Sequence, residues 1–415
     1  MQIKQNPFTS HIFSSKWFHH FNHNKQVFTF NFINGLSFFK PSILPVFINM
    51  GRNHSKGISY SLNVPKTINF NKSVLLIYDV PHYFDLDIEN APEKLAFHKI
   101  KQYPGYLVEL DRFNDLTDYF QKTFSKKTNN KLRRYQKRLE LCFNIKYKMF
   151  YGEMSKEDYD FIFDCFKKLL EKRFTDKQIA NNNLNPEEWA FYRDVALPMI
   201  LEKKASFFVV YEDSNPIAIT LNYFSENMLF HAITTFDIDY SKFHLGKIAM
   251  VHLFSWCFEN QIKCFDFSKG HFDYKTHWMT KKYDFEYHLY YDKTSIKSKF
   301  IGFIIKSLFE LKQNLREKEL NKKLHQLTFR FKTRGDNNKT SLKFTISDIT
   351  EEYKDLELLE IDLFHKELLP LKSIVNEYLF INSESLYKLK VMKVLSTQST
   401  YLFKGEKTSK KIVIS

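Results

Sequence analysis

Short polar turns divide residues 206 to 235 into apolar runs of similar length. The runs are Ser206–Tyr211, Ile217–Phe224 and Met228–Thr235. Apolar runs separated by short polar turns are typical of consecutive antiparallel strands. A loop then leads to Gly246, which opens a stretch of helical spacing as far as Glu259, and short strand candidates follow at Lys263–Phe267 and Tyr283–Tyr291. The pattern therefore predicts the order strand, strand, strand, helix, strand, strand.

Three helices are predicted upstream of these strands. Ser155 is placed to cap a helix over Lys156–Lys172, and Asn185 with Pro186 is placed to cap and open one that ends near Lys203. The segment Lys122–Arg138 contains eight basic residues and no acidic one, with apolar positions at helical spacing. It predicts an amphipathic helix whose cationic face could bind phosphates, although a solvated face is the commoner reason for a charge run.

The two ends of the chain have weaker patterns. Residues 1 to about 70 suggest irregular strands more than long helices, and Ser73–Val80 is a strand candidate. A basic helix is predicted after residue 300, and its cations could be attracted to an anionic membrane surface. We expect three domains: 1–120, which could be a degenerate half of the same fold as its neighbour; 121–332; and a small α+β appendage at 342–415. The appendage is predicted from a helix over Asp348–Leu369 and from three strands, Tyr387–Leu395, Thr400–Lys404 and Lys411–Ile414.

Glycine spacing excludes several nucleotide and hydrolase motifs. The 415 residues include only ten glycines, and no two lie closer than six positions. A dinucleotide fingerprint, a phosphate-binding loop and a Gly-x-Ser-x-Gly elbow all need closer pairs, so none can be present.

Charge and cysteine content point to the compartment and to a class of partner. The formal net charge is +15, which makes a phosphate-bearing partner worth considering, although a lysine-rich composition gives the same value without a ligand. The four cysteines form no CxxC pair, so we expect reduced thiols, no bound metal and a cytoplasmic location, with peripheral contact at the inner face of a membrane left open. No run of apolar residues is long enough to span a membrane.

Reactive residue types gather in the segment from Phe265 to Trp278. Two acids, two histidines, two lysines, a tyrosine and a tryptophan occupy a predicted loop at a strand end. Such a set can hold a proton acceptor and a cation near a developing oxyanion. The alternative is that the acids cap the loop and the aromatic residues close the sheet edge.

The region from Lys127 to Tyr291 resembles the GNAT-superfamily acyltransferases of the CelD-like branch, which are related to FemAB-like transferases. The resemblance rests on the basic helix at 128–134, the loop 237–246 and the phrase from Phe265-Asp266-Phe267 through Gly270 to Tyr274-Lys275 and Trp278. It implies an α/β (α+β) GNAT-like fold: a mixed, mostly antiparallel sheet flanked by helices. It also implies acyl-CoA, such as acetyl-CoA, as donor, bound between the third and fourth strands.

Roles for individual residues follow from the same resemblance. Lys275 would stabilise the acyl-transfer transition state, and Asp266 or His271 would take the proton from the attacking amine. The remaining expected site residues are Leu245, Gly246 and Lys247 for the donor pyrophosphate, and Tyr240, Tyr274, Trp278 and Arg134 for the substrate. The usual pyrophosphate motif has Arg or Gln, then Gly, then Gly or Ala, where this chain has Phe243, Gly246 and Ile248.

We therefore expect an N-acyltransferase that moves an acyl group from acyl-CoA to an amine. The acceptor implied by the resemblance is a small molecule or a glycan, for example an amino sugar or a polysaccharide precursor. Two alternatives stay open: a transferase that uses aminoacyl-tRNA, and a non-catalytic protein that binds nucleic acid or a membrane surface. The sequence leaves undetermined the acceptor, the acyl chain, the oligomeric state, the general base, and whether the donor is CoA, an acyl carrier protein or tRNA.

Overall fold

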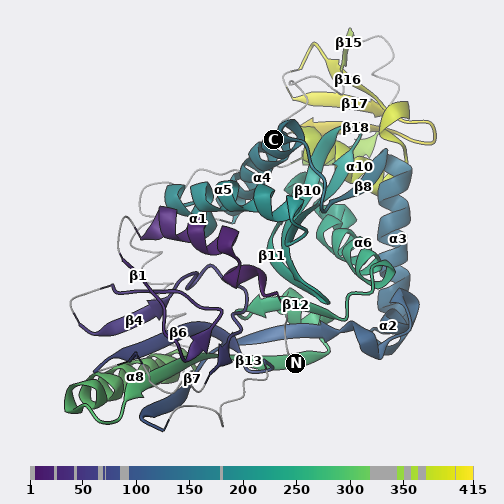
Figure 1. Ribbon diagram of the computed structural model, residues 1–415. Helices are drawn as coiled ribbons and strands as arrows, with labels where there is room; N and C mark the ends of the chain where they lie inside the picture. Colours follow the sequence, from purple (N-terminus) through teal and green to yellow (C-terminus); the bar gives the residue numbers. More distant parts are fainter. Residues whose placement is uncertain are drawn as a thin grey trace.

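The computed structural model describes residues 5–22, 26–41, 44–63, 69–70, 72–84, 93–177, 181–317, 344–349, 357–362, 371–397 and 399–414. Within them, eleven strands form one mixed sheet (Figure 1). In order across the sheet, these are β1 (Val27–Phe28), β3 (Phe38–Phe39), β4 (Val46–Asn49), β6 (Val74–Pro81), β13 (Lys281–Asp292), β7 (Leu95–Glu109), β12 (Cys264–Lys269), β11 (Met228–Phe236), β10 (Asn215–Ser225), β9 (Ala205–Glu212) and β8 (Ile145–Phe150). The pairs β4·β6 and β11·β12 are parallel and the other pairs are antiparallel, which confirms the mixed, mostly antiparallel sheet.

Helices cover both faces of this sheet. In the described chain they are α1 (His11–Phe21), α2 (Leu116–Thr123), α3 (Lys126–Cys142), α4 (Lys156–Asp176), α5 (Pro186–Leu201), α6 (Leu245–Glu259), α7 (Asp273–Trp278), α8 (Ile296–Glu317) and α10 (Lys372–Asn382). Short 3-10 helices are η1 (Pro7–Thr9), η3 (Leu110–Arg112), η4 (Asn182–Leu184), η5 (Ile238–Phe243) and η8 (Leu386–Lys388).

Strand β9 shows why both faces need cover. Successive side chains of a strand point to opposite faces. Phe207 and Val209 join the apolar cluster that contains α4 and α5, whereas Phe208 and Val210 join the cluster that contains α3 and α6. A strand buried on both sides has a continuous apolar run, which is the pattern seen in the sequence.

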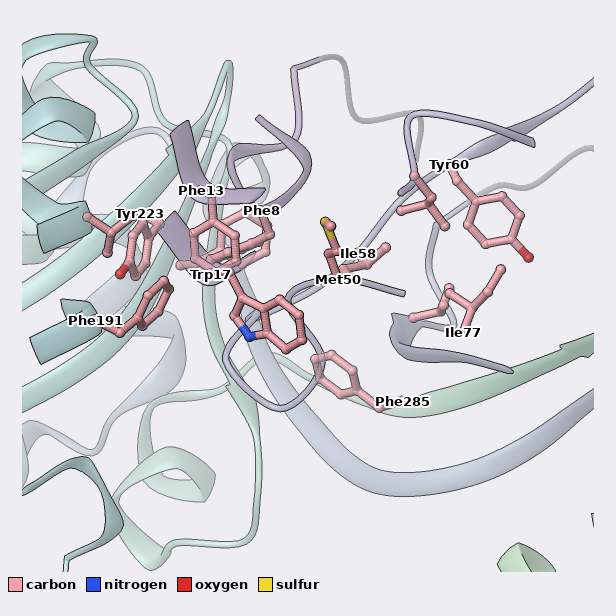
Figure 2. Close-up of a cluster of buried hydrophobic side chains, with 14 of the residues drawn as sticks. Phe8, Phe13, Trp17, Met50, Ile58, Tyr60, Ile77, Phe191, Tyr223 and Phe285 are labelled. Atoms are coloured by element: carbon pink, nitrogen blue, oxygen red, sulfur yellow. The ribbon is translucent and has the colours of Figure 1, made fainter. Parts of the chain in front are cut away.

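The N-terminal region packs into the same core as the central strands. Helix α1 begins after Ser10, whose hydroxyl accepts a hydrogen bond from the amide of Phe13. The ring of Phe13 lies 5.5 Å from that of Phe191 of α5 and 6.2 Å from that of Tyr223 of β10, and Figure 2 shows these rings together with Phe8. The expectation of mostly irregular strands before residue 70 thus missed one helix.

The C-terminal residues form a separate five-stranded sheet. Its order is β14 (Phe344–Asp348), β18 (Ser409–Ile414), β17 (Thr400–Lys404), β16 (Lys390–Val394) and β15 (Leu358–Ile361), and α10 packs beside it (Figure 1). The α+β character is confirmed, but the predicted helix over Asp348–Leu369 is wrong for residues 358–361, which are a strand. The rest of that predicted helix lies outside the described residues, apart from 348, 349, 357 and 362. A further two-stranded pair, β2 (Ile33–Asn34) and β5 (Ser61–Leu62), lies in the N-terminal region.

Most helix starts match the sequence. The Ser155 hydroxyl accepts a hydrogen bond from the amide of Asp158 at the start of α4. The basic segment is not one helix: Lys122 lies in α2, which ends at Thr123, and α3 begins at Lys126 with Leu132 and Leu139 on its buried side. Asn185 departs from expectation: Pro186 does open α5, but no side-chain hydrogen bond caps this helix among the described residues.

Candidate functional site

Strands β11 and β12 are parallel neighbours that separate after three residue pairs. Pairing runs from Met228 opposite Cys264 to Phe230 opposite Asp266. Beyond this point β11 continues along β10, whereas β12 runs beside β7. The backbone N–H and C=O groups of β11 and β12 therefore stop pairing with each other at Asp266, near the start of the segment Phe265–Trp278.

Asp266 lies at this branching point and is fully buried. Its carboxylate accepts hydrogen bonds from the hydroxyls of Tyr83, at 2.5 Å, and Tyr283, at 2.7 Å to each oxygen. The amide of Ser268 donates a further bond of 2.6 Å. Burial raises the pKa of Asp266 to about 6, against the opposing effects of these hydrogen bonds and of the Lys275 charge. A carboxyl group with this pKa can exchange a proton near neutral pH.

Lys275 is the second buried ionisable group of the segment. Its ammonium donates to the backbone carbonyls of Lys269 at 2.9 Å and Ser268 at 3.3 Å, and its side chain is 4% exposed. Burial and the charge of Lys56 lower the pKa of Lys275 to about 7, while Asp266 acts in the opposite direction. Lys275 comes from α7, whose short helical turn directs it back towards the end of β12.

His231 of β11 faces the same buried region. The register between β10 and β11 shifts at Ala232, and such a bulge re-aims the neighbouring side chains. The Nε2 atom of His231 is buried and has no hydrogen-bond partner among the described residues. Burial, and then the charges of Lys275 and Lys56, lower the pKa of His231 to about 3, so the ring is neutral at physiological pH.

The N-terminal region contributes Lys56 to this group. Burial and the nearby Lys269 lower the pKa of Lys56 to about 8, against the pull of Asp79 and Glu188. Lys269 is paired in turn with the fully buried Asp79. Two lysines with lowered pKa values and one carboxyl with a raised pKa therefore lie within electrostatic reach of one another.

The donor pyrophosphate is expected at the start of α6. Among the described residues no side chain caps this end, and the nearby Lys247 and Lys131 lower the pKa of His244 after the effect of burial. Such an uncapped, cationic helix start favours an anion. Close packing requires the glycine here, because a Cβ atom on Gly246 would lie 2.8 Å from the ring of Phe236.

Two other predicted site residues of the segment, His271 and Tyr274, do not both lie beside Lys275. His271 is exposed, and its Nδ1 atom is hydrogen-bonded to the Tyr106 hydroxyl at 2.7 Å. Tyr274 is partly exposed, and its ring centroid lies 6.4 Å from that of His231, which places it at the edge of the group.

Trp278 and Tyr240 are packed among core side chains. The Trp278 ring lies among aromatic side chains, 5.1 Å from Phe124 and 5.5 Å from Phe254, and it is 2% exposed. Tyr240 is fully buried and its hydroxyl donates to Glu212. Both side chains are therefore enclosed by protein, as are those of Asp266 and Lys275, and their assignment to the substrate stays a prediction. Leu245 is likewise a buried core side chain, so only its backbone could contact a donor.

Arg134 lies on the exposed side of α3. It lines a cavity of about 420 Å³ together with Arg133, Lys137 and Arg138, and Ser383 closes one side. The neighbouring Tyr135 packs against His244 at the start of α6 in a tilted arrangement, with ring centroids 4.1 Å apart. The cationic side of α3 and the uncapped end of α6 thus adjoin.

Sequence reasoning missed four residues of the group. These are Lys56, Tyr83, His231 and Tyr283. Tyr83 is separated from Asp266 by 183 positions, so no local pattern connects them. Within the described residues, no cluster of three or more His, Cys, Asp or Glu side chains could hold a metal ion, and no helix is long and apolar enough to cross a membrane.

Comparison with known proteins bears on the central part of the chain. Residues 126–276 match a family model described as an acetyltransferase (GNAT) domain, which confirms the expected superfamily there. No curated protein matches this chain. Similar solved structures include L-PGS from Bacillus licheniformis (14% identity, TM-score 0.41, 72% of this chain and 92% of that one) and FemX (12%, 0.41, 61% and 83%). Another is the C-terminal domain of a putative lysylphosphatidylglycerol synthetase from Agrobacterium fabrum (10%, 0.41, 68% and 88%). Similarities at this TM-score carry no argument about function.

Proposed function

Residues 126–276 belong to the GNAT acetyltransferases, and from this premise we propose that the chain transfers an acyl group from acyl-CoA to an amine. The observation that carries the proposal is the pair formed by Lys275 and Asp266 where β11 and β12 separate. Each is buried, and each has a pKa displaced towards neutrality. Buried ionisable groups with such values are concentrated at catalytic sites.

In this reaction the amine nitrogen attacks the thioester carbonyl carbon. The new C–N bond converts the carbonyl oxygen to an oxyanion, and the C–S bond then breaks to release the thiolate of CoA. We assign the stabilisation of the oxyanion to the Lys275 ammonium. A fixed cation in a water-poor site stabilises the transition state about as much as an oxyanion-hole donor does, by about 3 kcal/mol. Two backbone carbonyls already orient this ammonium.

The proton that leaves the amine goes to Asp266 in this proposal. Asp266 has no exposed surface of its own, so the half-buried Tyr83 hydroxyl, 2.5 Å away, is the route by which the proton enters. His271 is disfavoured as the base because it is held by Tyr106 and points to solvent. The neutral His231 ring lies beside the group, and its free Nε2 atom is available to orient the acceptor.

The donor's phosphates are assigned to the start of α6. Lys247 and Lys131 supply positive charge there, and amides at a helix start can donate hydrogen bonds to an anion. The acceptor, including the amino sugar or glycan precursor suggested by family resemblance, stays a prediction.

A second donor class is favoured by the cationic cavity on α3. Arg133, Arg134 and Lys137 line a surface hollow that suits a chain of phosphates better than a single pyrophosphate. Aminoacyl-tRNA is the donor that would use it. Binding to tRNA should then weaken steeply with salt and with Arg134→Gln, whereas binding of acyl-CoA should show a much smaller salt dependence.

Acyl transfer to a panel of amines tests the proposed function. The native chain, Lys275→Ala and the matched surface variant Lys146→Ala are incubated with labelled acetyl-CoA, and labelled amide is counted. We expect Lys275→Ala to lose at least about a hundredfold in rate, as for removal of an oxyanion donor, and Lys146→Ala to retain full activity. Equal rates in all three proteins would remove Lys275 from the mechanism.

A further inference from the structure

The outer side of α8 carries large apolar side chains that the described chain leaves exposed. They are Ile296, Phe300, Phe303, Ile304, Leu308, Leu311 and Leu315. Phe300 and Phe303 are 64% and 67% exposed. In Figure 1 the helix lies at the edge of the molecule beside β6, β7 and β13, with its length open to the outside.

These residues form one stripe opposite the side that packs on the sheet. A helix turns about 100° per residue, so spacings of three, four, seven and eight keep side chains on one side. The packed side is complete without them: Phe309 contacts the ring of Tyr287, with centroids 4.5 Å apart, and Gly302 lies under Tyr291. The core therefore has no need of the exposed stripe, and a contiguous apolar patch of this kind marks an interaction surface.

Positive charge accompanies the stripe. Five basic residues and two acidic ones lie on α8. Lys297, Lys299 and Lys312 are exposed, whereas Lys306 is paired with Glu310 at 3.9 Å. A helix with an apolar stripe, aromatic residues on it and lysines beside it is suited to the boundary between lipid tails and anionic headgroups. Lysine stems can lie along the apolar region while their ammonium groups reach the phosphates.

We propose that α8 binds the surface of a membrane that contains anionic lipids. The helix lies in the plane of the interface with Phe300 and Phe303 inserted among the acyl chains. The proposal is independent of the transferase activity. Contacts through β7 nevertheless connect α8 to the candidate site around Asp266. At its C-terminal end α8 contacts β7 through Arg316, whose guanidinium lies 3.5 Å from the centroid of Tyr103. Gly105 follows Tyr103 by two residues on β7 and lies directly against the ring of Tyr283, so closely that a Cβ atom there would overlap the ring. The hydroxyl of Tyr283 in turn donates a hydrogen bond to Asp266.

Vesicle flotation with the full chain tests the proposal. Vesicles of phosphatidylcholine alone are compared with vesicles of phosphatidylcholine and phosphatidylglycerol. We expect binding to the mixed vesicles that weakens as salt is raised, and much weaker binding to phosphatidylcholine alone. Failure of the native chain to float with the mixed vesicles would overturn the proposal.

Matched variants separate the stripe from general hydrophobicity and charge. Phe300→Ser with Phe303→Ser should lower partitioning by about tenfold for each ring removed, the change that corresponds to about 1.4 kcal/mol. Phe161→Ser removes a ring that is 49% exposed on α4 and should change nothing. Circular dichroism and the unfolding midpoint check that the variants fold.

Charge variants and the state in solution complete the test. Lys297→Gln with Lys299→Gln should reduce binding to mixed vesicles only, and Lys404→Gln, on the C-terminal sheet, should not. Full binding by the double phenylalanine variant would refute the proposal. So would a dimer in solution that this variant converts to monomer, since the stripe would then be an interface between copies of the chain. Acetyl-CoA binding should be equal in all variants, which keeps this test distinct from that of the transferase.

Discussion

Replacing Lys275 by methionine should make stability less dependent on pH. The folded state holds this amine at a pKa of about 7, against an ordinary lysine value of 10.5. Because the pKa is depressed, the unfolded chain binds the proton more readily, and the stability of the native protein rises with pH from about 7 to about 10.5. Each factor of ten in proton affinity is about 1.36 kcal/mol, so the buried amine costs the folded state about 4 kcal/mol at pH 7 and about 2 kcal/mol at pH 9.

Urea unfolding at pH 7 and pH 9 measures this difference. The native protein should gain about 2 kcal/mol more between the two pH values than Lys275→Met does, since methionine fills the same space without the proton. Lys56, whose pKa is also lowered by burial, contributes to the gain in both proteins. Lys146→Met, an exposed control on β8, should behave as the native chain does. If Lys275→Met and the native protein gain equally, the amine is not buried as described and its assigned role loses its basis.

Three other substitutions have expected outcomes. Asp266→Asn should remove the fall in transfer rate below pH 6, because the native carboxyl with its raised pKa must ionise to accept a proton; an unchanged acid limb in residual turnover would exclude it as the base. Gly246→Ala should lower the free energy of unfolding by roughly 1–3 kcal/mol, and combination with Phe236→Leu should restore part of it, since the new methyl group meets that ring. Trp278→Ala should cost about 3–5 kcal/mol in urea unfolding, and a cost below 1 kcal/mol would contradict its place in the core.

Local pattern was sufficient for the central strands and helices. The turns between β9, β10 and β11 are two residues each, 213–214 and 226–227, and lie within the polar stretches seen in the sequence. The cap at Ser155 is a local hydrogen bond. Residues 358–361 show where local pattern fails: Leu358, Leu359 and Ile361 fit a helical spacing and a strand equally over so short a stretch. The pairing of β15 with β16, which decides between the two, involves residues thirty or more positions away.

The candidate site was predictable only where its residues are close in sequence. Asp266 on β12 and Lys275 on α7 lie close together in one sequence motif, so the sequence indicated both. Lys56 and His231 lie near Lys275 because of the order in which the strands are arranged across the sheet. That order cannot be read from the residue types alone. Trp278 shows the converse, because an aromatic residue within a motif can equally fill a core, and its burial depends on helices α2 and α6 that the motif does not contain.

The most direct test of the central claim is the stabilisation of the native chain by acyl-CoA. Chemical unfolding is followed with a panel of acyl-CoA esters, each at increasing concentration. If the donor binds where β11 and β12 separate, the free energy of unfolding should rise by about 2.7 kcal/mol at one hundred dissociation constants, and Lys275→Ala should show the same rise because Lys275 acts on the transition state. The absence of stabilisation by every ester in the panel would contradict the account.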